Sequence, residues 1–163
     1  MAIHAEPVFQ FDPLTATSTA PTSGLGDVVT DKHGNRLMLV KMSGSTTTAS
    51  VRGGCCGWRT SDSTGYTVTP DISASAEALA LGCVLVSASV NYYQYIMIEG
   101  CPGDYISSLQ TDGGISANDR LYWKTDNQWG GSITRTTALG KTRAADDTNS
   151  LLSAEAVWLT GPT

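Results

Sequence analysis

The sequence predicts an all-β protein: a single small barrel or sandwich of short antiparallel strands, preceded by an extended N-terminal arm. About ten short segments rich in β-branched and aromatic residues follow one another at regular intervals, separated by Gly, Asn and Asp. Charged residues make up only 15% of the 163 residues, well below the roughly 25% of an ordinary soluble domain. A chain of this length can bury one core. We assign residues 1–25 to the arm and residues 26–163 to the β domain.

The arm contains both phenylalanines of the chain. Phe9 and Phe11 stand two residues apart, as on a strand, and the following TATSTAPTSG is too polar and small-sided to form a core. Aromatic side chains in a leader that cannot fold by itself indicate docking. We therefore expect Pro7, Val8, Phe9 and Phe11 to bind a partner protein or a neighbouring subunit. Packing of both rings on their own domain is the alternative.

The first half of the β domain begins with a predicted hairpin over residues 26–41, whose turn contains His33-Gly34-Asn35. Residues 51–58 contain three glycines and predict an irregular strand or a bulged loop. Residues 66–70 alternate with threonines, as a solvent-facing strand would. The Ala-rich residues 74–81 predict the only helix, a short one.

Residues 81–100 predict the central pair of strands. In the second of these, Tyr93, Tyr95 and Met97 share one face, and the other face is also largely apolar. A strand with two apolar faces is covered on both sides, either by the rest of its domain or by another subunit. Tyr93, Tyr95 and Met97 are therefore a possible subunit interface.

The second half of the chain continues the same pattern. Strands are expected at residues 105–110, 121–123, 133–139 and 154–159. A turn is expected at residues 127–131.

Charge and hydropathy exclude several classes of partner. The formal net charge is −5 and no cluster of Lys and Arg occurs, which argues against binding to nucleic acid. No apolar run approaches the roughly 20 residues of a membrane span, so no membrane partner is expected. The residues after Met1 lack the pattern of a signal peptide.

The four cysteines, Cys55, Cys56, Cys83 and Cys101, do not have metal-ligand spacing. We interpret them as free thiols of a protein made in a reducing cytoplasm.

No catalytic set emerges from the residues. Gly140-Lys141-Thr142 resembles the end of a phosphate-binding loop, but Arg135 stands where that loop requires glycine. The two histidines lie in the arm (His4) and in a hairpin turn (His33), and neither position holds an imidazole rigidly. We therefore expect no enzymatic activity, no cofactor and no metal.

Four tryptophans, at positions 58, 123, 129 and 158, could stack on a sugar. Trp123 and Trp129, which flank a polar turn, are the strongest candidates. Burial in a core or at a protein interface is the favoured interpretation.

The order of these segments resembles the small capsid decoration, or cement, proteins of tailed bacteriophages. The pieces of that family are a Gly-x-x-Val, turn, Leu-x-Leu-Val-Lys hairpin, a Gly-Val strand, a Tyr-x-x-Ile-x-x-x-Gly strand, a small-residue turn with Gly-Asp-x-Leu, a Leu-Gly-x-Ala type strand and a Val-x-Leu end. In this chain they are residues 26–41, 82–84, 93–100, 118–121, 139–142 and 157–159.

The resemblance implies a β-rich homotrimer on the outer surface of a phage capsid, bound to the major capsid protein and stabilising its lattice, without enzymatic activity. It also implies synthesis in the host cytoplasm and a final location in the virion. The alternative function is a phage tail or fibre receptor-binding module that holds a glycan on Trp123 and Trp129.

Overall fold

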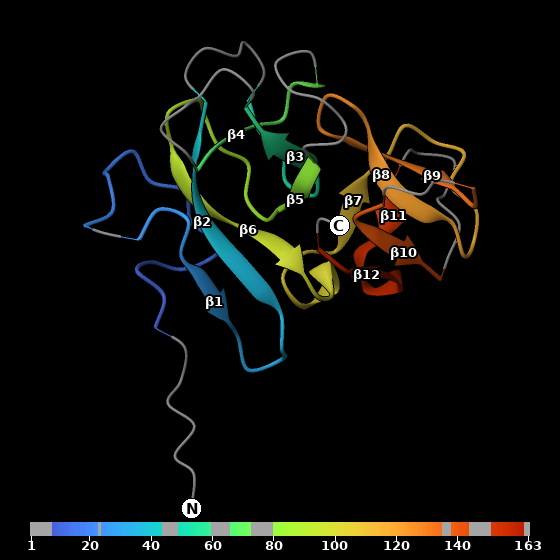
Figure 1. Cartoon of the computed structure of the whole chain (residues 1–163), viewed down its shortest axis with the longest axis horizontal. Helices are drawn as coiled ribbons and strands as arrows, with labels where there is room; N and C mark the ends of the chain where they lie inside the picture. Colours follow the sequence, from blue (N-terminus) through green and yellow to red (C-terminus); the bar gives the residue numbers. More distant parts are fainter. Residues whose placement is uncertain are drawn as a thin grey trace, which may run out of the picture.

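The computed structural model describes residues 8–22, 24–43, 49–59, 66–72, 80–134, 138–143 and 151–161. This part of the chain is all-β, as predicted, with two short 3-10 turns (Figure 1). The strands are β1 (Val28–Thr30), β2 (Arg36–Met42), β3 (Cys55–Trp58), β4 (Thr67–Thr69), β5 (Ala80–Val84), β6 (Tyr93–Glu99), β7 (Ser108–Gln110), β8 (Arg120–Thr125), β9 (Gln128–Ser132), β10 (Gly140–Thr142), β11 (Leu151–Ser153) and β12 (Val157–Leu159). The 3-10 turns are η3 (Pro102–Asp104) and η4 (Ala154–Ala156).

The first sheet closes on itself. Its strands are ordered β1-β2-β4-β3-β5-β6, and β6 also pairs with β2, so that β2, β4, β3, β5 and β6 form a five-stranded barrel. Closure satisfies backbone groups that an open sheet would leave at its edges. The predicted small barrel is confirmed. One pairing, between β2 and β4, is parallel rather than antiparallel.

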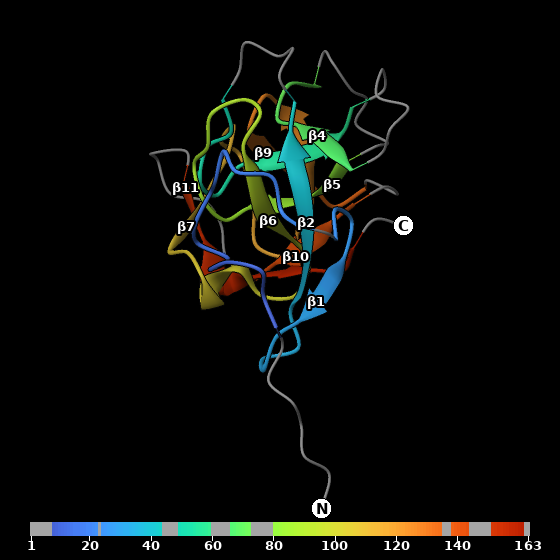
Figure 2. The same cartoon turned by 90° about the vertical axis from the view of Figure 1, so that its left-hand side faces the viewer.

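The second sheet has the order β12-β10-β8-β9 and lies beside the barrel (Figures 1 and 2). All its pairings are antiparallel. A two-stranded ribbon of β7 and β11 and the turns η3 and η4 complete the described part of the fold.

The buried side chains form two clusters. The smaller takes residues from every barrel strand, including Val40 of β2, Val68 of β4 and Ile96 of β6, and fills the barrel. The larger combines outward-facing barrel residues, such as Leu39, with residues of the second sheet, such as Leu121. It is the layer between the barrel wall and the second sheet.

β6 separates these two clusters, and its residues from Gln94 to Ile98 are buried. The prediction that this strand is covered on both faces is confirmed. The cover comes from the chain itself, through the barrel interior on one side and the second sheet and arm on the other.

Several local predictions are wrong. Residues 127–131 belong mostly to β9, because Asp126 and Asn127 alone make the turn, with Asn127 at φ 58°. Val68 and Thr69 of β4 are fully buried instead of facing solvent, because β4 is a barrel strand between β2 and β3. The helix expected at 74–81 falls mostly outside the described residues, and its last two residues begin β5.

Candidate functional site

The outer face of the second sheet presents charged and aromatic side chains on paired strands. In β10 and β12 the middle residue is exposed and its two neighbours are buried. Because side chains alternate along a strand, Lys141 and Trp158 point away from the core while Val157 and Leu159 point into it. Trp158 is 51% exposed.

Three outward residues form a row across three neighbouring strands. Lys141 of β10 lies opposite Arg120 of β8 on one side and opposite Trp158 of β12 on the other. Directly opposed side chains of antiparallel strands have Cβ atoms about 4.5–5.5 Å apart. Two cationic side chains and one indole are therefore neighbours on the same face.

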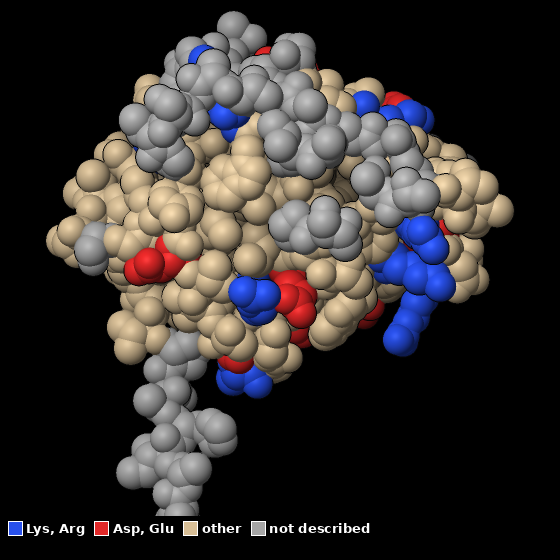
Figure 3. Space-filling view, in the orientation of Figure 1, with Lys and Arg blue, Asp and Glu red and all other residues tan. Residues whose placement is uncertain are grey.

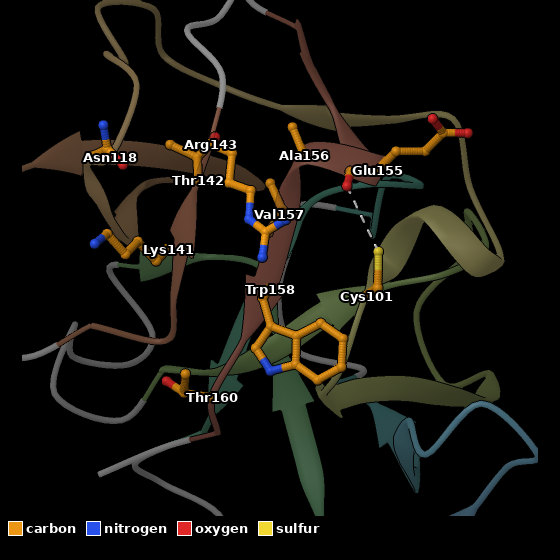
Figure 4. Close-up of a pocket in the computed structure, with 10 residues that line it drawn as sticks. All are labelled: Cys101, Asn118, Lys141, Thr142, Arg143, Glu155, Ala156, Val157, Trp158 and Thr160. Carbon is orange, nitrogen blue, oxygen red and sulfur yellow. Dashed lines mark hydrogen bonds between the residues drawn. The ribbon is translucent and has the colours of Figure 1, made fainter.

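Arg143 extends this row beyond the end of β10. Its backbone N–H donates to the carbonyl of Ala156 at 2.8 Å, which continues the pairing of β10 with β12. Two residues after Lys141, it lies on the same face as Lys141. Figure 4 shows the Arg143 side chain directed toward β12, on the same side as Trp158.

Lys141, Arg143 and Trp158 line an open groove of about 650 Å³. Its lining residues are Cys101, Asn118, Lys141, Thr142, Arg143, Glu155, Ala156, Val157, Trp158 and Thr160 (Figure 4). In the figure, Lys141 and Cys101 lie on opposite sides of β12.

The groove is cationic in a protein whose net charge is −5. The ion pairs among the described residues are Arg36 with Glu99, at 3.0 Å, and Lys124 with Asp112, at 2.8 Å, so neither Lys141 nor Arg143 has a carboxylate partner in that part of the chain. Basic side chains gather over the β10 side of the molecule in Figure 3.

Glu155 is the one carboxylate among the described residues that line the groove. Asp119 is buried, and its Oδ2 accepts a hydrogen bond from the Ser116 N–H at 2.9 Å. Asp146 and Asp147 lie outside the described residues.

The groove has the composition of a binding surface. Its lining includes one thiol, Cys101, whose Sγ lies 3.7 Å from the carbonyl oxygen of Ala154 and 4.0 Å from that of Glu155. None of the described residues that line it is a histidine. Across the described residues, no group of three or more His, Cys, Asp or Glu side chains is placed to hold a metal ion. The arrangement can hold an anionic, partly apolar group through ion pairs and contact with an indole.

The arm packs on its own barrel. The rings of Phe9 and Phe11 lie 5.3 and 5.2 Å from that of Tyr95, and the N–H of Gln10 donates to the Tyr95 hydroxyl at 3.1 Å. Phe9 and Phe11 therefore pack on their own domain, as the alternative held, and docking of the arm on a partner stays a prediction. Val8 remains 87% exposed, and Pro7 lies outside the described residues.

The predicted subunit interface is also corrected. Tyr95 and Met97 are buried to 1% and 0% exposure in the layer between barrel and second sheet, so they present no surface to another subunit. Tyr93 is half-buried, pairs with Thr17 of the arm, and has the Lys41 Nζ 5.9 Å from its ring centroid.

Trp123 and Trp129, the strongest glycan candidates, are fully buried. Trp129 donates its indole N–H to the carbonyl of Gly53 at 3.0 Å, which links the second sheet to the loop before β3. These two tryptophans are core residues, as the favoured interpretation held. The exposed tryptophan is Trp158. The alternation Val157-Trp158-Leu159 could have indicated its exposure, because Val157 and Leu159 are buried.

No protein-family model matches this chain, and no curated protein or solved structure matches it either. Within the described residues, none of the helices has the length and hydropathy needed to cross a membrane.

Proposed function

We propose that this protein is a structural, non-enzymatic capsid decoration protein, which binds the outer surface of a tailed-phage capsid and stabilises the lattice of the major capsid protein. The sequence resemblance supports this function. The observation that carries it in the structure is the exposed row of Arg120, Lys141 and Trp158 on a sheet whose other face contributes Leu121, Trp123 and Val157 to the main core.

Such a row suits attachment to another protein. Trp and Arg are the residues that most often dominate the binding energy at protein interfaces. Here they stand on antiparallel strands whose inner side chains, such as Leu121 and Val157, belong to the main core. A surface held in this way loses little conformational entropy when it binds.

The remaining parts of the proposal follow from the resemblance. The protein binds the major capsid protein and itself, as a homotrimer, and needs no cofactor. It is made in the host cytoplasm and ends on the capsid surface. The apolar faces of β6 no longer argue for the trimer, because the chain itself covers both of them.

Co-sedimentation with undecorated capsids tests the proposal. We expect the full-length protein to sediment with capsids and to raise the temperature at which they release DNA. Trp158→Ala should weaken binding, while Tyr66→Ala, which removes another exposed aromatic ring (44% exposed), should leave it unchanged. Absence of co-sedimentation by the unmodified protein would contradict the proposed function.

A further inference from the structure

We propose that the groove beside Trp158 binds an extended acidic segment of the protein partner, with carboxylates at alternate positions that pair with Lys141 and Arg143. The inference rests on the proposed function, because the segment is taken to belong to the surface that the protein decorates. It adds the chemistry by which that surface is recognised.

The spacing of the two cations defines the segment. Lys141 and Arg143 are two residues apart at the end of β10 and lie on the same face. Positions i and i+2 of an extended chain are about 6.6–6.8 Å apart. An extended partner segment lying along β10 repeats the same distance between its own alternate side chains. Glutamates at i and i+2 would therefore each meet one cation.

Trp158 supplies the apolar floor of the groove. It lies opposite Lys141 on β12, and Arg143 is paired with the neighbouring Ala156. The methylene groups of a glutamate side chain can pack on the half-exposed indole while the carboxylate reaches the cations. Arg143 can also hold a carboxylate with two parallel hydrogen bonds.

Charge favours an acidic occupant in this groove. Among its described lining residues, Lys141 and Arg143 outnumber the single carboxylate, Glu155, whereas the whole chain has an excess of five negative charges. A volume of about 650 Å³ falls within the roughly 300–1,000 Å³ of ligand sites. Asn118 and Thr160, which also line the groove, offer polar side chains to the backbone of an extended segment.

Other polyanions fit less well. Binding to a nucleic acid requires cations that follow successive phosphates, and the negative charge of the rest of the protein opposes it. A sulfated or carboxylated glycan presents hydroxyl donors that require several acceptors, and the charged side chains of the groove are mainly donors.

The test uses the full-length protein and labelled peptides. The first peptide alternates Glu with Thr, the second has Gln in place of Glu, and the third has the same composition as the first with its glutamates adjacent. We expect fluorescence anisotropy to show binding of the first peptide, weakened by added salt, and at least about tenfold weaker binding of the other two.

Charge reversal identifies the residues. Lys141→Glu with Arg143→Glu should weaken both peptide and capsid binding at least about tenfold. Lys32→Glu with Arg36→Glu changes the net charge equally on the β1–β2 hairpin, and should leave both within about twofold of the unmodified protein. Lys141→Gln with Arg143→Gln provides the same test, should the double reversal lower the melting temperature.

The two proposals fail in different ways. If the unmodified protein binds capsids and the Lys141 and Arg143 variants bind them equally well, the inference is overturned and the proposed function stands. If the unmodified protein binds the alternating peptide through these residues but not capsids, the proposed function fails. Tighter binding of a heparin fragment or of single-stranded DNA than of the alternating peptide would also overturn the inference.

Discussion

The barrel and the second sheet are both built from short strands, but they differ in how many faces of each strand are buried. In the barrel, β5 is buried at every position and β6 from Gln94 to Ile98, because one face of each strand meets the barrel interior and the other meets the second sheet or the arm. In the second sheet, β10 and β12 alternate buried and exposed residues. A strand that is buried on both faces cannot bind a partner through its side chains. A strand that is buried on one face can bind a partner through the other.

This difference predicts that a tryptophan-to-alanine substitution destabilises the protein much more at a buried position than on the outer face of the second sheet. Trp129→Ala should lower the free energy of unfolding by about 3–5 kcal/mol, because it removes a fully buried indole from the layer between barrel and second sheet. It also leaves the Gly53 carbonyl without the 3.0 Å hydrogen bond from the indole. Trp158→Ala should cost less than about 1 kcal/mol, because that ring is half-exposed.

Urea unfolding followed by circular dichroism measures both values. Equal losses for the two variants would show that the outer face of the second sheet is as structural as the inner one. The division between a packed face and a binding face would then be wrong.

A second prediction concerns the connection that leaves the barrel after β6. Asp31 of the β1–β2 turn accepts hydrogen bonds from the His33 N–H, the Asn35 N–H, the Asn35 side-chain amide and the Tyr105 hydroxyl, all at 2.8–2.9 Å. The same Asn35 amide donates to Asp104 of η3 at 2.8 Å, and its Oδ1 accepts from the Cys101 N–H at 2.8 Å. This network holds η3 against the barrel.

Asp31→Ala should therefore destabilise the protein by about 2–3 kcal/mol at neutral pH. Burial works to raise the pKa of Asp31, but the hydrogen bonds from Asn35, Tyr105 and His33 outweigh it and lower the pKa below its ordinary 3.8. The ionised carboxylate thus stabilises the fold above pH 3.8, and this contribution disappears as the pH falls through the folded-state pKa. Melting temperatures measured from pH 7 downward should converge for the unmodified protein and the variant. If the difference in melting temperature between the two proteins stays constant down to pH 2, the ionised form of Asp31 does not account for the stabilisation.

A third prediction addresses the arm, which the structure assigns to the barrel. Phe11→Ala should cost about 1–2 kcal/mol, roughly two thirds of what full burial of such a ring contributes, because Phe11 is only partly buried against Tyr95. Capsid binding per folded molecule should not change. Retained stability with weakened capsid binding would instead restore the arm as a partner-binding segment.

The sequence predicted some local elements correctly, but it did not predict the long-range contacts. The residue types and turns of residues 26–42 predict the β1–β2 hairpin, and the two apolar faces of residues 93–99 predict a covered strand. Neither pattern says what covers a face, because an apolar surface packs equally well on a second sheet or on another subunit. Tyr95 and Met97 were therefore assigned to a subunit interface, although the protein's own second sheet and arm bury them.

The groove shows the same limit. Trp158 lies 17 residues after Lys141 and 15 residues after Arg143 in the chain. Only the register of β10 with β12 makes them neighbours. The alternation around Trp158 predicts its exposure, but nothing in the sequence indicates that two cations without carboxylate partners among the described residues lie beside it.

The smallest expected effects concern the cysteines, whose reactivity should differ between the barrel and the groove. Cys55, Cys56 and Cys83 lie buried in β3 and β5, whereas Cys101 is partly exposed and lines the groove. All four are free thiols, although Cys55 and Cys83 are directly opposed in the β3–β5 pairing. A reducing agent should therefore leave the melting temperature unchanged, because no cross-link constrains the unfolded chain.

Burial raises the pKa of Cys56 to about 12 and that of Cys83 well above its ordinary value, so both stay protonated and unreactive at neutral pH. A thiol reagent at pH 7.5 should label Cys101 first in the native protein, and the other three only after unfolding. Cys101→Ser provides the control, since it should abolish the fast phase. Fast labelling of a barrel thiol in that variant would show that the barrel opens as readily as the groove, which would end the distinction between the two regions.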